Sequence, residues 1–313
     1  MLVEINNLVK RYGDLIALDH FNLQVKEGEV FGLLGPNGSG KTTAINCMLA
    51  LLKYSKGTVE VFGKPMTPDS YAAKRDIGLV MQNVAVFDEL TVYENIDYFC
   101  GLYIHDSKRR KDLVDEAISF VGLEDFTKFV PKKLSGGLLR RLNIACGIAH
   151  KPKLIFLDEP TVAVDPQSRN KILEGILELN RQGATIIYTS HYMEEVEQIC
   201  TRIAIMDKGK VIAEGTSEEL KDMIRTGETI TVELPEAPVD LTDLTEQVAL
   251  LPHVVSAEMQ NSHLVIQSER RQHNLTNVIE FLQSRGLVYG RVLCELPTLN
   301  DVFLEITGKQ LRD

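Results

Sequence analysis

Residues 29–43 read EVFGLLGPNGSGKTT, and this segment indicates the fold of most of the chain. The continuous apolar run at 29–34 is typical of a strand that is covered on both faces. From Lys41 onward the segment reads as a helix. Between them, residues 35–42 match G-x-x-x-x-G-K-[ST], in the strand–loop–helix context that a phosphate loop needs. The alternative, a tight turn with an incidental lysine, explains fewer of these features, so we expect a nucleotide-binding α/β fold.

The loop chemistry follows from its residue types. Its glycines let the backbone curl until N–H groups converge on phosphate oxygens, and the helix N-terminus adds positive potential. Lys41 is expected to reach the β- and γ-phosphates of ATP, the Thr42 hydroxyl to bind Mg²⁺, and Thr43 to bond the α-phosphate. The nucleotide-binding residues predicted in this loop are Gly35, Pro36, Asn37, Gly38, Ser39, Gly40, Lys41, Thr42 and Thr43.

A second motif, LIFLDEP at 154–160, supplies carboxylates at the end of another buried strand. Asp158 is placed to enter the Mg²⁺ shell, and Glu159 to accept a proton from the attacking water or polarise it. Two carboxylates after a strand are often only a helix cap. Paired with a phosphate loop, they favour the catalytic interpretation.

Further buried runs at 76–82, 184–191 and 202–206 alternate with helical patterns, notably at 168–182. Buried strands that alternate with helices indicate a parallel α/β sheet, whose ligands lie at the carboxyl ends of the strands. Helical patterns dominate between about residues 83 and 152, which predicts a helical insertion in the α/β core.

Within that insertion, residues 107–121 place apolar side chains on one helical face, with Ser107 as the expected N-cap. The ATP-binding domain is expected to span residues 1–226, ending after a capping box at 216–224. From 227 to 313 a smaller α+β domain is predicted. Its expected elements form a split β-α-β-β-α-β, ferredoxin-like arrangement, with strands at 229–234, 254–259, 263–267 and 287–295 and helices at 241–251 and 274–285.

Composition narrows the function classes. The chain has 313 residues and a formal net charge of −10, which argues against general nucleic-acid binding. Its five cysteines lie far apart, as expected for reduced core thiols. The opening residues lack the basic start and apolar run of a signal peptide, and no apolar run approaches the roughly 20 residues of a membrane span. Work at a membrane would therefore need a partner.

At this point the sequence resembles the ATP-binding subunits of ABC transporters. LSGGLLRRL (134–142) resembles the family signature, Gln82 the Q-loop glutamine, and VDP (164–166) the D-loop. His191 in TSHYMEE resembles the switch histidine, and Tyr12 lies where the family has an aromatic that stacks on adenine. Together with the phosphate loop and LIFLDEP, these motifs appear in family order over about residues 2–220.

The resemblance implies that two ATP-binding domains pack head to tail, so that each ATP bound on one phosphate loop is capped by the other chain's signature. Ser135 and the amides of Gly136 and Gly137, at a helix N-terminus, form an anion site without a lysine of their own. Two residues depart from the family pattern before the D-loop aspartate, where Ala163 and Val164 replace Gly-Leu, and this puts tight coupling of the two sites in doubt.

Catalytic roles also follow from the resemblance. Glu159 would be the general base, and His191 would contact the γ-phosphate. Gln82 would contact Mg²⁺ and water and relay the nucleotide state to the helical insertion. Asp165 would cross the dimer interface. Leu138 replaces the usual glutamine of the signature, a position that does not bind phosphate.

The ending PTLNDVFLEITG (297–308) resembles the subfamily of drug, antibiotic and sodium exporters, whose membrane half is a separate polypeptide. We therefore expect an ATPase that energises export at the cytoplasmic face of the membrane, as a homodimer or a heterodimer with a paralogue, docked on a permease. The alternatives are an ABC ATPase that acts on ribosomes or DNA, and a nucleotide sensor that does not hydrolyse ATP. The C-terminal domain is expected to serve dimerisation or regulation.

Overall fold

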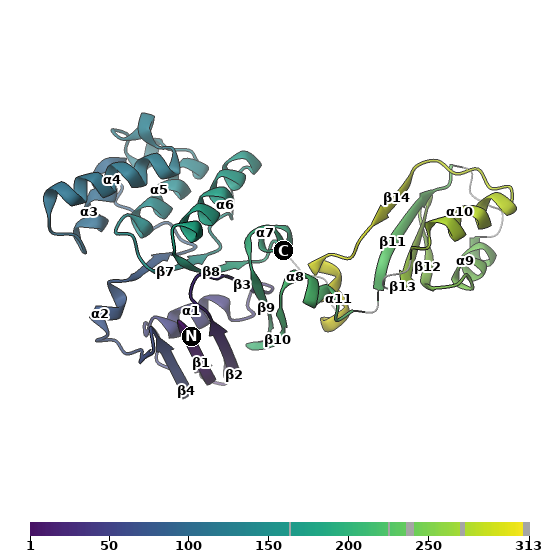
Figure 1. Ribbon diagram of the computed structural model, residues 1–313, viewed down its shortest axis with the longest axis horizontal. Helices are drawn as coiled ribbons and strands as arrows, with labels where there is room; N and C mark the ends of the chain where they lie inside the picture. Colours follow the sequence, from purple (N-terminus) through teal and green to yellow (C-terminus); the bar gives the residue numbers. More distant parts are fainter. Residues whose placement is uncertain (163, 225, 236–240, 270–272, 309–313) are drawn as a thin grey trace. The chain divides into compact units, whose positions relative to one another are not determined.

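The chain folds into two compact units, which meet in sequence between Ser217 and Glu218. The structure, a computed structural model, describes residues 1–162, 164–224, 226–235, 241–269 and 273–308 (Figure 1). The sequence placed the boundary later, at 226/227, because the segment 216–224 reads as the end of the first domain. The structure groups most of that segment with the second unit, including all of α8 (Ser217–Lys221) except its first residue.

A six-stranded sheet forms the centre of the first unit, in the order β10-β9-β3-β8-β7-β6. Its neighbours from β9 to β6 pair in parallel, and β10 pairs antiparallel with β9. Every buried run singled out in the sequence forms one of these strands, so the predicted α/β fold is confirmed. The strands are β3 (Val30–Leu34), β6 (Ile77–Val80), β7 (Leu154–Asp158), β8 (Thr185–Ser190), β9 (Arg202–Asp207) and β10 (Lys210–Gly215).

A second, antiparallel sheet has the order β2-β1-β4-β5, with strands β1 (Val3–Tyr12), β2 (Leu15–Val25), β4 (Lys56–Val61) and β5 (Lys64–Pro65). Helix α1 (Lys41–Met48) shares one apolar core with residues of both sheets. Its Ile45 and Met48 are fully buried there, beside Phe21 of β2 and Phe31 of β3. This packing fixes the start of α1, and therefore the loop before it.

The helical insertion between β6 and β7 comprises α3 (Val92–Gly101), α4 (Ser107–Val121), α5 (Gly136–Ile148) and two short 3₁₀ turns at Glu124–Phe126 and Pro131–Lys133 (Figure 1). The expected cap of α4 was wrong by one residue. Asp106, not Ser107, is the N-cap, because its carboxylate accepts a hydrogen bond from the Arg109 amide at 2.7 Å.

Helix α5 approaches the large sheet closely through two glycines. A Cβ on Gly78 of β6 would lie 2.6 Å from the carbonyl oxygen of Gly147 in α5, and one on Gly147 would lie 2.7 Å from a methyl group of Val80. The absence of a side chain at Gly78 and Gly147 therefore allows this helix to pack closely against the sheet. The remaining helices of the unit are α2 (Tyr71–Lys74), α6 (Pro166–Arg181) and α7 (Met193–Ile199).

The second unit contains an antiparallel sheet in the order β12-β13-β11-β14. This order confirms the split β-α-β-β-α-β arrangement. The last strand is shorter than predicted, since Leu287 and Tyr289 pack against the apolar core before the strand begins. The elements are β11 (Thr226–Glu233), α9 (Leu241–Ala249), β12 (Val254–Gln260), β13 (His263–Glu269), α10 (Leu275–Ser284), β14 (Val292–Glu295) and α11 (Leu299–Thr307).

All five cysteines are free. Cys47, Cys100 and Cys146 are buried as expected, whereas Cys294 is exposed, so the expectation of a core thiol was wrong at that position. Among the helices of the described ranges, none combines the length and the apolar character needed to cross a bilayer.

Candidate nucleotide-binding and hydrolysis site

The loop between β3 and α1 needs glycine at two of its positions. Gly38 and Gly40 have φ angles of 81° and 108°, in the left-handed region that a residue without Cβ adopts readily. A Cβ on Gly40 would also lie 2.7 Å from the Ala17 carbonyl oxygen. The loop can therefore wrap tightly only with these residues, and it delivers Lys41 to the first turn of α1.

A cavity of about 470 Å³ opens beside this loop. It gathers predicted residues from four separate parts of the sequence, together with Leu15, Ile16, Ala17 and Lys208, which the sequence interpretation did not identify. No local motif marks these four, because only the fold brings them to the loop. The lining residues are Tyr12, Leu15, Ile16, Ala17, Asn37, Gly38, Gly40, Lys41, Thr42, Thr43, Gln82, Glu159 and Lys208.

Three predicted loop residues, Gly35, Pro36 and Ser39, do not line the cavity. Lys41 donates hydrogen bonds to the carbonyl oxygens of Gly35 at 2.7 Å and Pro36 at 3.3 Å. The third, Ser39, is buried, and its amide bonds back to Pro36. These contacts give Gly35 and Pro36 a role in orienting the lysine.

The Lys41 ammonium is buried next to a carboxylate. Its Nζ lies 3.3 Å from Oε1 of Glu159, and both side chains are almost fully enclosed. Burial lowers the pKa of Lys41, and the negative charge of Glu159 acts in the opposite direction. The phosphate loop and the LIFLDEP motif thus form one charged centre, as the sequence predicts.

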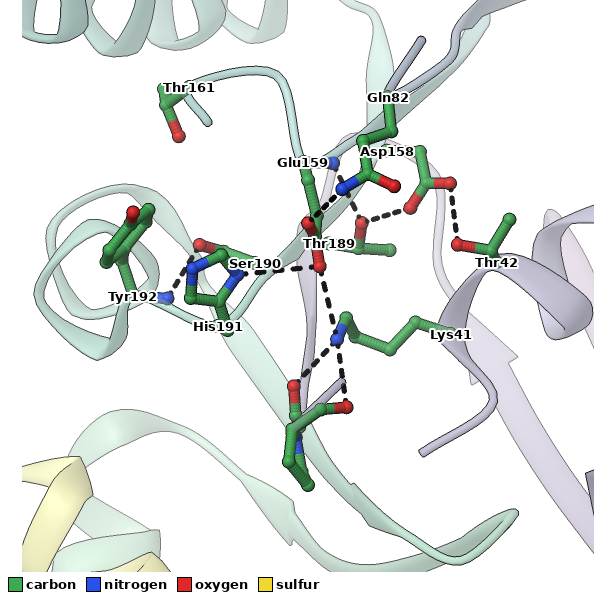
Figure 2. A network of polar contacts seen from close by, with 12 residues as sticks. Lys41, Thr42, Gln82, Asp158, Glu159, Thr161, Thr189, Ser190, His191 and Tyr192 are labelled. Carbon is green, nitrogen blue, oxygen red and sulfur yellow. Dashed lines mark hydrogen bonds and ion pairs between the residues drawn. The ribbon is translucent and has the colours of Figure 1, made fainter. Parts of the chain in front are cut away.

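Asp158 is completely buried at the end of β7. Its Oδ2 accepts a hydrogen bond from the Thr42 hydroxyl at 2.9 Å, and its Oδ1 accepts one from Thr189 of β8 at 2.6 Å (Figure 2). Two of the three predicted Mg²⁺ ligands, Thr42 and Asp158, are therefore in contact. Hydroxyl and carboxylate oxygens suit Mg²⁺, which proteins usually bind through one or two carboxylates together with substrate phosphates.

Glu159 lies at the centre of the network in Figure 2. Its φ angle is 48°, an uncommon value for a residue with a side chain, and its amide donates to the carbonyl and hydroxyl oxygens of Thr189. Its Oε2 accepts a hydrogen bond from Gln82 Nε2 at 2.9 Å, while Oε1 lies 3.5 Å from Nδ1 of His191. Backbone strain that is held by neighbouring bonds is common at functional sites.

The signature residues lie outside this cavity. Ser135 caps α5 by accepting a hydrogen bond from the Leu138 amide at 3.3 Å, and both Ser135 and Gly136 are exposed. Gly137 is buried, and a Cβ there would lie 2.8 Å from Ser168 Oγ and 3.1 Å from Asp165 Oδ2. The sequence interpretation expected only a ligand contact at Gly137, and the structure adds close packing against the start of α6.

Comparison with known proteins agrees with this geometry. The ABC transporter family matches residues 18–162. The linearmycin resistance ATP-binding protein LnrL of Bacillus subtilis (strain 168) is 36% identical, with 100% of each chain covered. The Nod factor export ATP-binding protein I of Sinorhizobium fredii is 33% identical over 99% of this chain and 87% of that protein. A dimeric structure of the ATP-binding cassette MJ0796 with ADP and Pi shares 30% identity, covering 68% of this chain and 98% of its own, with a TM-score of 0.63.

The chain belongs to the ABC transporter family. It is an ATP-binding and ATP-hydrolysing subunit, and the motif-based prediction of this activity is confirmed. The predicted ATP-binding core is confirmed as well, because the solved cassettes share its fold.

One further residue of this ABC ATPase, Arg140, was missed. Its buried guanidinium donates to the carbonyl oxygens of Met81 at 3.1 Å, Gln82 at 2.7 Å and Glu159 at 3.3 Å. Burial lowers the pKa of Arg140, opposed by Asp158 and Glu159. The pair of arginines in the signature segment was visible in the sequence, but helical periodicity alone did not show which one turns inward.

The structure also shows the contacts of two other predicted site residues of this ABC ATPase, Tyr12 and Asp165. Tyr12 lines the cavity with 46% of its surface exposed, and the Lys10 ammonium lies 4.5 Å from its ring centroid. Asp165 is the exposed N-cap of α6, where the Ser168 amide lowers its pKa. The substitution noted at Ala163 lies outside the described residues, while Val164 is buried.

Proposed function

We propose that this ABC ATPase hydrolyses MgATP in a head-to-tail dimer, with each ATP held between the phosphate loop of one chain and the signature of the other. One observation carries the proposal. Lys41, Gln82, Glu159 and His191 converge within one chain, whereas Ser135 lies outside the cavity of its own chain. The dimeric form of the similar cassette MJ0796 supports this arrangement.

The residue contacts support specific roles in hydrolysis. Glu159 accepts a proton from the attacking water, since its carboxylate faces the cavity and is oriented by Gln82. Lys41 binds the β- and γ-phosphates, and its ion pair with Glu159 must loosen as it does so. His191, next to Glu159, contacts the γ-phosphate and holds the reactive geometry.

Thr42, Asp158 and Gln82 would hold Mg²⁺, and their oxygen atoms fit its preference. Bound Mg²⁺ would neutralise charge that develops on the phosphate oxygens. In the partner chain, Ser135 and the amides of Gly136 and Gly137 would face the terminal phosphate, and Asp165 would lie at the dimer interface. Loss of the γ-phosphate after hydrolysis removes this shared ligand and releases the dimer.

The transport role extends this proposal to a partner. Relatives named for linearmycin resistance and Nod factor export support export through a separately encoded membrane subunit, with this chain at the cytoplasmic face. An exposed aromatic pair, Phe87 and Tyr98 with ring centroids 4.9 Å apart, offers an apolar surface for that subunit. Asn95 holds the backbone of Phe87 through two hydrogen bonds and thereby connects the segment after Gln82 to α3.

Replacing Glu159 by Gln tests the hydrolysis proposal. The amide keeps the size of the side chain but cannot accept the proton, so phosphate release should fall about 10²- to 10⁴-fold while ATP binding persists. An ATP-bound dimer should then accumulate and be visible by analytical ultracentrifugation in MgATP. Full turnover by this variant, or a monomer at saturating ATP, would reject the proposal.

The same trapped variant separates the alternatives. Retention of the tagged chain on membranes that contain the cognate permease supports transport. Recovery on ribosomes or DNA instead would favour the other class of ABC ATPase. A wild-type chain that binds ATP but releases no phosphate, with or without permease, would indicate a nucleotide sensor.

A further inference from the structure

Glu195 is a buried carboxylate that the proposed hydrolysis mechanism does not use. It lies in α7 and is only 3% exposed. Its Oε2 accepts hydrogen bonds from three hydroxyl groups, those of Tyr188 at 2.7 Å, Thr161 at 2.8 Å and Ser190 at 3.1 Å. A buried charge is costly unless it is paired and hydrogen-bonded, so this arrangement indicates a specific role for the carboxylate.

These donors belong to segments that carry the proposed catalytic groups. Thr161 follows Glu159 by two residues, in the turn after β7. Ser190 directly precedes His191, and its hydroxyl also accepts a hydrogen bond from the Tyr192 amide at 2.9 Å (Figure 2). One carboxylate oxygen therefore joins the segment after the general base to the loop that bears the histidine.

The other oxygen of Glu195 faces a third segment. Oε1 lies 3.2 Å from Nε of Arg169, in an ion pair that is not aligned for a hydrogen bond. Arg169 belongs to α6, the helix that Asp165 caps. Its guanidinium also lies 4.8 Å from the ring centroid of Tyr192. Glu195 is thus connected to the helix that begins at the proposed dimer interface.

The aromatic neighbours extend the connection to the histidine itself. The rings of His191 and Tyr192 have centroids 4.1 Å apart, so the position of Tyr192 constrains His191. Burial, with a further contribution from Glu195, raises the pKa of Tyr188 well above its usual value. Tyr188 therefore stays protonated near neutral pH and remains a donor to the carboxylate.

We propose that Glu195 is a positioning residue that fixes His191 relative to Glu159 and links both to the α6 segment that carries Asp165. Replacing it should slow hydrolysis and leave ATP binding intact, because Glu195 does not line the cavity. This inference rests on the roles proposed above for Glu159 and His191. A residue that served folding alone would lower stability without changing the rate per folded molecule.

The first experiment compares Glu195→Gln with Glu194→Gln, its exposed neighbour on the same helix. Loss of the charge should release Arg169 and the loop of His191, so kcat for phosphate release should fall about 10- to 100-fold, the size expected for a misplaced catalytic group. KM and the Kd for ATP should stay within about twofold. The Glu194 variant should match wild type, and a wild-type kcat for Glu195→Gln would overturn the proposal.

A second experiment asks whether Glu195 acts through His191. In a His191→Ala background, Glu195→Gln should slow the residual phosphate release by less than about twofold, because groups that act as a unit are not additive. A full, multiplicative loss in that background would overturn the proposal. If Glu195→Gln does not fold, Thr161→Val and Tyr188→Phe take its place, because each removes only one hydrogen-bond donor to Glu195. Each of them is then compared in the wild-type and His191→Ala backgrounds in the same way. Unaltered hydrolysis by Glu159→Gln and His191→Ala would instead refute the proposed function.

Discussion

The proposed ATP site has two glycine-containing segments, the phosphate loop (35–43) and the signature (135–137). These segments differ strongly in the contacts that they make within their own chain. In the phosphate loop, Lys41 is buried against Glu159, and left-handed glycines shape the backbone. In the signature, Ser135 is exposed, and within the part of the chain that the structure describes its hydroxyl bonds only to the first turn of its own helix. A glycine-rich helix start therefore does not reveal by itself whether its ligand comes from the same chain.

The difference also separates two reasons for glycine. Gly40 is needed because its φ angle is left-handed and a carbonyl lies close by. Gly137 lies within an α-helix and is needed because Asp165 and Ser168 pack where its Cβ would be. One glycine shapes a ligand loop, and the other lets the signature helix meet α6.

The largest effect is expected when two inactive variants, one damaged in each glycine-containing segment, are mixed. Lys41→Ala damages only the phosphate-loop side and Ser135→Arg only the signature side, so each alone should lose about 10²-fold or more in phosphate release. In a heterodimer one of the two sites is intact, and a 1:1 mixture should regain roughly a quarter of wild-type activity if the sites are independent.

A matched control for this mixture combines Lys41→Ala with Glu159→Gln, which damage the same side of the site. Each heterodimeric site then carries one defect, and no activity should return. Equal recovery in both mixtures, or none in the first, would show that the signature does not serve the facing chain.

A smaller effect is expected for Gly137→Ala. The added methyl would lie 2.8 Å from Ser168 Oγ, and overpacking of this kind costs about 1–3 kcal/mol in the free energy of unfolding. Gly136→Ala, at the exposed first helical position, should be neutral or stabilise by about 0.4–1 kcal/mol. Chemical denaturation of the full chain measures both, and equal stability of the two variants would show that packing does not explain Gly137.

The smallest expected effect concerns His150, which follows α5 and links the signature helix to the sheet. Its Nε2 lies 3.1 Å from the Ile77 carbonyl oxygen, and its ring stacks on Tyr103 with centroids 4.0 Å apart. Burial lowers the pKa of His150 below its usual 6.5. The folded chain then binds fewer protons than the unfolded chain, so the stability that His150 contributes is present above about pH 6.5 and is lost as pH falls further.

Thermal unfolding at pH 7.5 and pH 5.5 measures this contribution. The Tm of wild type should drop more than that of His150→Gln, with a difference on the order of 2 °C. The amide keeps a hydrogen-bonding group but does not titrate in this range. If the Tm of both proteins changed equally between the two pH values, His150 would not contribute to the pH dependence of stability.

Much of the site could be predicted from sequence because its chemistry is local. The loop 35–43 contains both its backbone geometry and its lysine, and LIFLDEP contains both its strand and its carboxylates. Since parallel strands end at one edge of the sheet, the sequence also predicted that these motifs would meet, as Lys41 and Glu159 do. Residues from other parts of the chain that contact these two motifs could not be predicted from local sequence.

Periodicity and short motifs encode the α/β core, the split arrangement of the second unit and the motif residues around the nucleotide cavity, so the sequence alone predicts these features. It does not predict Leu15, Ile16, Ala17 and Lys208, which also line the cavity. Only the tertiary structure decided that Arg140 turns toward Glu159, that Gly137 packs against α6, and that Glu195 receives three hydroxyl groups. Each of these depends on contacts between residues far apart in the chain. Such contacts exist only once the sheet and its helices have packed, and no local pattern specifies them.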